Sequence, residues 1–256
     1  MLMVKGRSRL STELDKIISW LGQWVSFNEE VIASRNVLIG MFTYQGERWI
    51  DEAIESVFEL NHSNWHLLIV DDGSTDGTPG KIRAWKEKCP ERISHILLAK
   101  NRAPYNTINL GLEWLLEHPE YEVFTILDQD DVMVPDAMYK GLRLLGMSSQ
   151  VVRCRNARYN IDFSEWFYDY FATTQLFIHR EVIQRIGLRL ERSVENPSDA
   201  EYLTRIFRDA VDIGYAVIST QGICQRMRVH GGNQILGQKT KAAKMLRDKL
   251  GLSEVE

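Results

Sequence analysis

Between residues 36 and 127, short apolar runs alternate with segments in which apolar residues recur every three to four positions. Near-continuous apolar runs are typical of strands buried on both faces, and the longer recurrence is typical of helices. The predicted strands are 37–42, 65–70, 93–98 and 123–127, and the predicted helices between them are 49–60, 79–88 and 105–117. The alternation therefore predicts an α/β fold with a largely parallel sheet covered by helices on both faces.

The rest of the chain is less regular. An amphipathic helix is expected at 11–25, ahead of the main pattern. The elements expected after the fourth strand are a strand at 174–178, helices at 180–186 and 199–211, and a final strand at 215–219. The stretch 151–171 is rich in Arg, Tyr, Phe and Trp and follows no clean period, so no element is predicted there.

Composition excludes several functional classes. The chain has 256 residues and 44% hydrophobic content, enough for one large domain or two small ones, and its net charge of -4 provides no basic field for nucleic acid. Cys89, Cys154 and Cys224 form no C-x-x-C pair, so we expect reduced thiols in a cytosolic protein and no zinc site. The sequence shows neither a secretory signal nor an apolar run long enough to span a membrane.

Polar clusters follow three of the predicted strands. They are the segments 43–47 (TYQGE), 71–77 (DDGSTDG) and 128–131 (DQDD). Ligands of open parallel sheets bind at the carboxyl ends of the strands, so we expect all three clusters at one edge. The crowded carboxylates of Asp128, Asp130 and Asp131 repel one another, which favours a hard divalent metal among them. The alternative interpretation is a solvated turn after a strand.

The 71–77 cluster has more than one interpretation. From Asp72 onward it matches the first half of an EF-hand loop, but the twelfth position is Arg83 instead of the required Glu, which argues against calcium. For residues 74–76 we favour a turn and a helix cap, and for Asp71 and Asp72 we favour ligand contact at the strand tip. No Rossmann, P-loop or hydrolase-elbow motif occurs, so any phosphate must be held mainly by a metal.

Together these segments resemble the family 2 glycosyltransferases. The resemblance is carried by residues 37–44, by IVDDGSTD at 69–76 and by LDQDD at 127–131, and it extends from about residue 36 to about residue 234. It implies the GT-A fold, with a mostly parallel central sheet flanked by helices, and here an extra N-terminal helix. The implied division is an N-terminal helical extension at 1–35, a nucleotide-sugar-binding half at 36–135, an acceptor-binding half at 136–235 and a basic C-terminal helix at 236–256.

The resemblance also assigns roles to single residues. Asp130 and His230 would hold Mn²⁺ or Mg²⁺ at the diphosphate, and Asp199 would be the general base, with Glu201 as the alternative. The residues that would contact the nucleotide sugar are Thr43, Tyr44, Asp71, Asp72, Asn101, Asp128 and Gln129. Structural interpretations remain open: His230 as a core or capping residue, and Asp199 as a helix N-cap.

This sequence departs from the family pattern at several positions. Gln45 stands where Asn is usual. Ile108 replaces an Arg that pairs with the diphosphate in the family, so that charge is either absent or supplied by Arg102. Ser198 replaces the usual Glu before Asp199, which weakens the assignment of the base.

The implied function is a metal-dependent, inverting transfer of a sugar from a nucleotide diphosphate sugar, with UDP-sugars favoured, to a glycan or lipid-linked acceptor in surface polysaccharide synthesis. The alternative is a non-catalytic nucleotide-sugar-binding subunit of a glycosyltransferase complex. Residues 153–171 would either cradle a sugar acceptor or pack in the core. The basic helix 239–249 would either touch anionic lipid at the inner face of the membrane or present a solvated face.

Overall fold

The computed structural model describes most of the region that carries the predicted strands. The described residues are 29–102, 104–145, 150–187, 208–215, 217–230, 244–245 and 247–248. Three expected elements lie wholly or largely outside these ranges, namely the helices at 11–25, 199–211 and 239–249. Asp199 and Glu201, the two candidates for the general base, also lie outside them.

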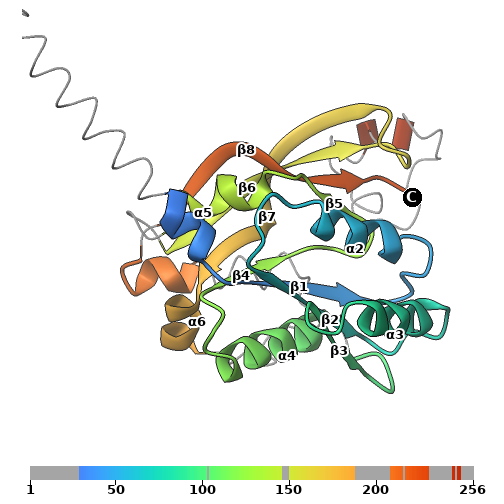
Figure 1. The fold of residues 1–256 in the computed structure, drawn as a ribbon. Helices are drawn as coiled ribbons and strands as arrows, with labels where there is room; N and C mark the ends of the chain where they lie inside the picture. Colours follow the sequence, from blue (N-terminus) through green and yellow to red (C-terminus); the bar gives the residue numbers. More distant parts are fainter. Residues whose placement is uncertain are drawn as a thin grey trace, which may run out of the picture.

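One eight-stranded sheet organises the described residues (Figure 1), in the order β3-β2-β1-β4-β7-β6-β8-β5. The strands are β1 (Val37–Thr43), β2 (Trp65–Asp71), β3 (Ile93–Leu97), β4 (Val123–Ile126), β5 (Val132–Met133), β6 (Val151–Tyr159), β7 (Trp166–His179) and β8 (Val217–Arg228). The first four strands pair in parallel, β6 also runs parallel to β8, and the other three pairings are antiparallel.

Helices cover both faces of this sheet. They are α2 (Ile50–Phe58), α3 (Thr78–Lys88), α4 (Pro104–Glu117), α5 (Ala137–Leu142) and α6 (Arg180–Ile186). One core lies under α2, α3 and α5, and a second lies under α4 and α6 on the opposite face. Successive residues of β1 alternate between these cores: Ile39 and Met41 enter the first, whereas Leu38 enters the second. The predicted α/β fold with a mostly parallel sheet is confirmed.

The antiparallel half of the sheet departs from the sequence prediction. The stretch without a clean period contains β6 and the start of β7, and the final strand runs on to Arg228 instead of ending at Ser219. The pairing of β6 shifts register between Arg153 and Arg155 and again near Tyr159. Each extra residue at such a bulge moves the following side chains to the other face, which removes the period-two signal from the sequence.

The three cysteines lie within the described residues. Cys154 and Cys224 are buried and Cys89 is half-buried, all as free thiols. No described helix is long and apolar enough to cross a membrane.

His66 on β2 is a buried titratable residue away from the polar strand ends. Its side chain stacks on Trp114 of α4 with 5.5 Å between ring centroids, and Nε2 lies 3.0 Å from the Ser94 hydroxyl. Burial, assisted by the positive charge of Lys86, lowers the pKa of His66 to about 4. Folded protein therefore keeps this imidazole neutral at pH values where the unfolded chain protonates it.

We expect the free energy of unfolding to fall as the pH is lowered from about 6.5, the ordinary pKa, toward about 4. In this window the unfolded state binds a proton at His66 that the folded state does not bind. Urea unfolding at pH about 7.5 and about 5 measures the effect, and His66→Gln should lose less stability between the two conditions than the wild type. An identical pH dependence in both proteins would contradict this assignment.

Candidate active site

The three polar clusters at the strand ends meet at one edge of the sheet. The Gln129 side chain joins two of them: Oε1 accepts from the Tyr44 amide at 2.8 Å and contacts the Thr43 hydroxyl, and Nε2 donates to the Tyr44 carbonyl at 2.9 Å. The amide of Asp72 donates to the Thr43 carbonyl at 2.8 Å and so connects the third cluster, residues 71–77, to the other two. The predicted convergence of segments far apart in sequence is confirmed.

Gln45 ties the first cluster to the second. Its backbone has φ 54°, in the left-handed region, where Asn is more common. Its side-chain Oε1 accepts from the amides of Thr75 and Asp76 at 3.1 and 3.2 Å, while Nε2 donates to the Thr75 hydroxyl. Glu47 adds a contact, because its Oε2 accepts from the Gly77 amide at 3.0 Å. The longer Gln side chain thus has a structural use in bridging two loops.

The Asp71 carboxylate binds within its own loop, whereas the Asp72 carboxylate binds the segment that follows β3. Asp71 is 1% exposed and accepts from the amide and the hydroxyl of Ser74 at 3.0 and 2.5 Å. Asp72 accepts from the Arg102 amide at 2.7 Å. Asp76 accepts from the Thr78 amide at 3.0 Å, in agreement with the turn expected for residues 74–76. The predicted helix cap is wrong, because the N-cap of α3 is Gly77, which has no side chain to cap the helix. A carboxylate has about four acceptor sites, so these bonds leave capacity for a ligand at Asp71.

Asn101 is brought to the same edge by a close backbone approach. Gly73 has φ 75°, which favours glycine, and a Cβ there would lie 2.5 Å from the Lys100 carbonyl carbon and 2.8 Å from the Asn101 amide nitrogen. The loop after β2 can therefore press against residues 100–101 only with a glycine at this position.

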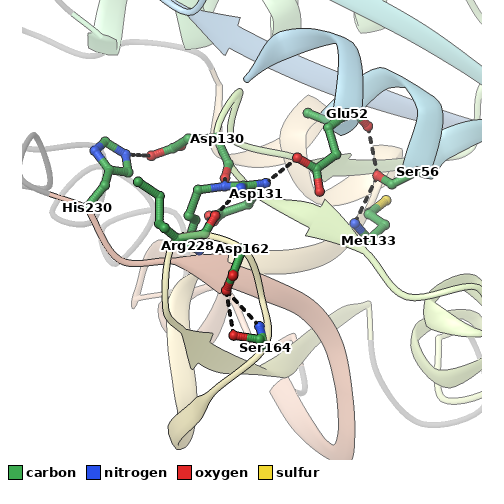
Figure 2. Close-up of polar contacts among 11 residues, drawn as sticks. Glu52, Ser56, Asp130, Asp131, Met133, Asp162, Ser164, Arg228 and His230 are labelled. Carbon is green, nitrogen blue, oxygen red and sulfur yellow. Dashed lines mark hydrogen bonds and ion pairs between the residues drawn. The ribbon is translucent and has the colours of Figure 1, made fainter. Parts of the chain in front are cut away.

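Asp131 is the most buried member of the acidic cluster (Figure 2). It is 2% exposed, its amide donates to the Asp128 carbonyl at 3.2 Å, and its Oδ1 accepts from the Arg228 amide at 2.9 Å. Burial and the negative charges of Asp130 and Asp128 raise the pKa of Asp131 well above its ordinary value. Asp131 therefore shapes the turn, as the sequence suggested, and also anchors the end of β8.

Asp130 and His230 lie together although they are 100 residues apart in sequence. His230 Nε2 is 2.8 Å from Asp130 Oδ2, and the two side chains are 19% and 20% exposed (Figure 2). The imidazole also rests against the Trp49 ring, with 5.6 Å between centroids. The two residues that the resemblance assigned to a metal thus converge in space.

The Asp130 carboxylate fits Mn²⁺ or Mg²⁺, whereas the imidazole of His230 is a nitrogen donor of the kind that transition metals accept and Mg²⁺ does not favour. Both ions prefer oxygen ligands, and Mg²⁺ commonly takes one or two carboxylates while phosphates and water supply the rest. Within the described ranges no group of three His, Cys, Asp or Glu side chains could hold a metal. Asp130 and His230 are the residues that would hold such an ion if one binds here, as the resemblance implied.

Arg228, at the end of β8, connects three segments around the acidic loop. Its side chain is 3% exposed, Nε donates to the Asp130 carbonyl at 3.0 Å, and Nη2 pairs with Glu52 Oε2 at 2.6 Å. Nη1 donates to the Ile161 carbonyl in the loop between β6 and β7. Its guanidinium carbon lies 4.3 Å from the ring centroids of both Trp49 and Phe163.

Sequence reasoning did not single out Arg228. The available signal was its place two residues before His230, in the segment Arg228-Val229-His230. The contacts to Glu52 and Ile161 could be recognised only from the tertiary structure.

Comparison with known proteins identifies the family. The family model described as Glycosyl transferase family 2 matches residues 38–211, more than half of the chain and including all three strand-end clusters. The chain belongs to glycosyl transferase family 2. This membership agrees with the resemblance carried by the acidic cluster and the loop after β2.

Curated relatives of this family 2 transferase match over part of their length. The putative teichuronic acid biosynthesis glycosyltransferase TuaG of Bacillus subtilis is 31% identical over 103 residues, which are 40% of this chain and 39% of TuaG. The putative glycosyltransferase EpsE of the same organism is 30% identical over 110 residues, 43% of this chain and 37% of EpsE. The matches thus span well under two thirds of either relative.

Solved structures show the fold of the family 2 transferase to be GT-A. The mannosyltransferase PcManGT from Pyrobaculum calidifontis, in complex with GDP-Man and Mn²⁺, aligns with a TM-score of 0.61 at 18% identity, over 86% of this chain and 66% of that chain. TarS 1–349 of S. aureus, in complex with UDP-GlcNAc, aligns with a TM-score of 0.60 at 12% identity, over 84% and 65% of the two chains.

Proposed function

We propose that this transferase moves a sugar from a nucleotide diphosphate sugar to a hydroxyl of a glycan or lipid-linked acceptor, with inversion, in surface polysaccharide synthesis. The observation that carries the proposal is the approach of His230 to Asp130 at the same sheet edge as Asp71 and Asp72. The teichuronic acid assignment of TuaG supports the pathway class, and the UDP-GlcNAc complex of TarS supports a UDP-sugar donor.

Each side chain at the edge has a role in this proposal. Thr43 and Tyr44 border the nucleobase, Asp71, Asp72 and Asn101 line the nucleotide, and Asp128 faces the ribose. Mn²⁺ or Mg²⁺ held by Asp130 and His230 would stabilise the negative charge that develops on the departing diphosphate.

We assign Gln129 a different role from the one that the resemblance implied. The sequence placed it among the nucleotide-sugar contacts, but both ends of its amide bind the backbone of Tyr44. We therefore assign Gln129 to holding the loop after β1 in position, one step removed from the ligand.

Asp199 is the proposed general base, with Glu201 as its alternative. The carboxylate accepts the proton of the acceptor hydroxyl. The hydroxyl oxygen thereby becomes more nucleophilic as it attacks the anomeric carbon. A single in-line displacement of the diphosphate then inverts the configuration at that carbon. We also propose a cytoplasmic location, with the basic segment 239–249 attracted to anionic lipid at the inner face of the membrane.

A panel of UDP-, GDP- and dTDP-sugars, tested by thermal shift with Mn²⁺ and with EDTA, examines the donor site. We expect a UDP-sugar to raise Tm by about 5 °C or more at about 100 times its Kd, and only with Mn²⁺, because ligand binding stabilises the folded state. Failure of every nucleotide sugar to shift Tm would contradict the proposal. Binding without release of nucleoside diphosphate, when a glycan acceptor mixture is added, would favour the non-catalytic subunit, which the altered segment 101–109 makes a specific alternative.

A further inference from the structure

The loop between β6 and β7, residues 160–165, lies directly beside the acidic loop. A single guanidinium, that of Arg228, donates both to the Asp130 carbonyl and to the Ile161 carbonyl. Figure 2 shows Asp162 and Ser164 of this hairpin next to Arg228. The hairpin tip is therefore separated from a proposed metal ligand by the width of one side chain.

The hairpin is held in one conformation by its own polar groups. Asp162 Oδ1 accepts from the amide and hydroxyl of Ser164 at 3.1 and 2.7 Å, and Asn160 Oδ1 accepts from the Glu165 amide at 3.0 Å. Phe163 completes the turn with φ 59° and packs edge-on against Tyr159, with 5.9 Å between ring centroids. A surface fixed in this way loses little conformational entropy when a ligand binds.

Trp166 stands at the base of the hairpin on the same face as Arg228. Tyr159 is the register partner of Trp166 on β7 and of Arg228 on β8, and register partners share a face of the sheet. Arg226, two residues before Arg228, lies over the Tyr159 ring at 5.9 Å, which agrees with this placement. Trp166, Tyr159 and Arg228 thus form a row across β7, β6 and β8 that leads toward the acidic loop, and Arg226 lies beside Tyr159.

The outer end of this row is open to solvent. Trp166 is 53% exposed and Ile161 is 38% exposed, and Arg226 is also exposed. The indole of Trp combines an apolar face with a polar N–H, and Trp is enriched at binding interfaces for this reason. A sugar ring offers the matching chemistry. Its apolar C–H face suits the indole of Trp166, and its hydroxyls can accept hydrogen bonds from the exposed guanidinium of Arg226.

We propose that Trp166 and the 160–165 hairpin form an acceptor subsite that stacks a sugar ring of the acceptor. This inference rests on the proposed function. The backbones of Trp166 and Arg228 are two strand spacings apart, about 10 Å, which exceeds the length of one sugar ring. The acceptor in this proposal is therefore an oligosaccharide end of at least two sugar units, with one ring on Trp166 and another nearer the acidic loop.

Saturation-transfer NMR with p-nitrophenyl glycosides of cellobiose, maltose, lactose and chitobiose tests this subsite, in the presence of UDP and Mn²⁺. We expect at least one disaccharide to bind the wild type, and Trp166→Ala to weaken that binding about tenfold through loss of stacking. Trp166→Tyr should retain most of the affinity. Tyr139→Ala is the matched control, because Tyr139 is an aromatic residue of α5 with 46% exposure.

The outcomes separate the subsite from the donor site. Equal disaccharide binding by wild type and Trp166→Ala, or binding of UDP but of no disaccharide by the wild type, would overturn the acceptor subsite. Equal weakening in Tyr139→Ala would overturn it as well. A wild type that binds disaccharide but no UDP would contradict the proposed function itself, and the acceptor role with it.

Discussion

Replacement of Asp130 by alanine is expected to lower the rate of sugar transfer by about a thousandfold or more at saturating donor. The substitution removes the carboxylate that lies 2.8 Å from His230 and leaves the imidazole as the remaining proposed protein ligand. Negative charge on the departing diphosphate is then less well stabilised in the transition state, so the activation free energy rises. Release of nucleoside diphosphate measures the rate, and an EPR titration measures the affinity for Mn²⁺ independently of turnover.

The fold of the Asp130→Ala protein should be retained, because Arg228 contacts the backbone carbonyl of residue 130 and not its side chain. Asp136→Ala is the control, since Asp136 forms an exposed i,i+4 ion pair with Lys140 on α5 and should keep full turnover. Unchanged turnover and Mn²⁺ affinity in Asp130→Ala would show that the metal is held elsewhere.

Replacement of Arg228 by methionine is expected to reduce both stability and metal affinity. The change leaves the carbonyls of Asp130 and Ile161 and the carboxylate of Glu52 without this donor, and we expect a loss of about 3 kcal/mol in the free energy of unfolding. Since the guanidinium also fixes the backbone that carries Asp130, the Kd for Mn²⁺ should rise about tenfold or more. Urea unfolding and an EPR titration of the folded protein measure the two effects.

Arg180 provides a matched control for a general loss of stability. Its guanidinium donates to the carbonyls of Leu115, Leu116 and His118 at the end of α4, and so it also satisfies several backbone acceptors, but on the opposite face of the sheet. Arg180→Met should lose comparable stability while the Kd for Mn²⁺ stays unchanged. A similar rise in Kd in both variants would show that Arg228 has a structural role only.

Much of the segment 36–135 could be predicted from the sequence because its signals are local. Apolar runs such as 65–70 and 123–127 are buried on both faces, so each reads as a strand without knowledge of its neighbours. Parallel strands all end at one edge, so the positions of Asp71 and Asp130 in sequence were enough to predict that their loops meet. The roles of these carboxylates toward a ligand are proposals that the variants above test.

The remaining features depended on contacts that no local pattern encodes. Bulges in β6 shift the side-chain alternation, so the strand that places Tyr159 left no regular period in the sequence. The approach of His230 to Asp130, the three-way contact of Arg228 and the exposure of Trp166 each follow from strand order and register across the antiparallel half. The sequence by itself determined the fold class and the edge that carries the chemistry, because burial and strand direction are local or topological properties. Only the tertiary structure decided which distant side chains meet there, because a shift of one residue in register would point each of them to the other face.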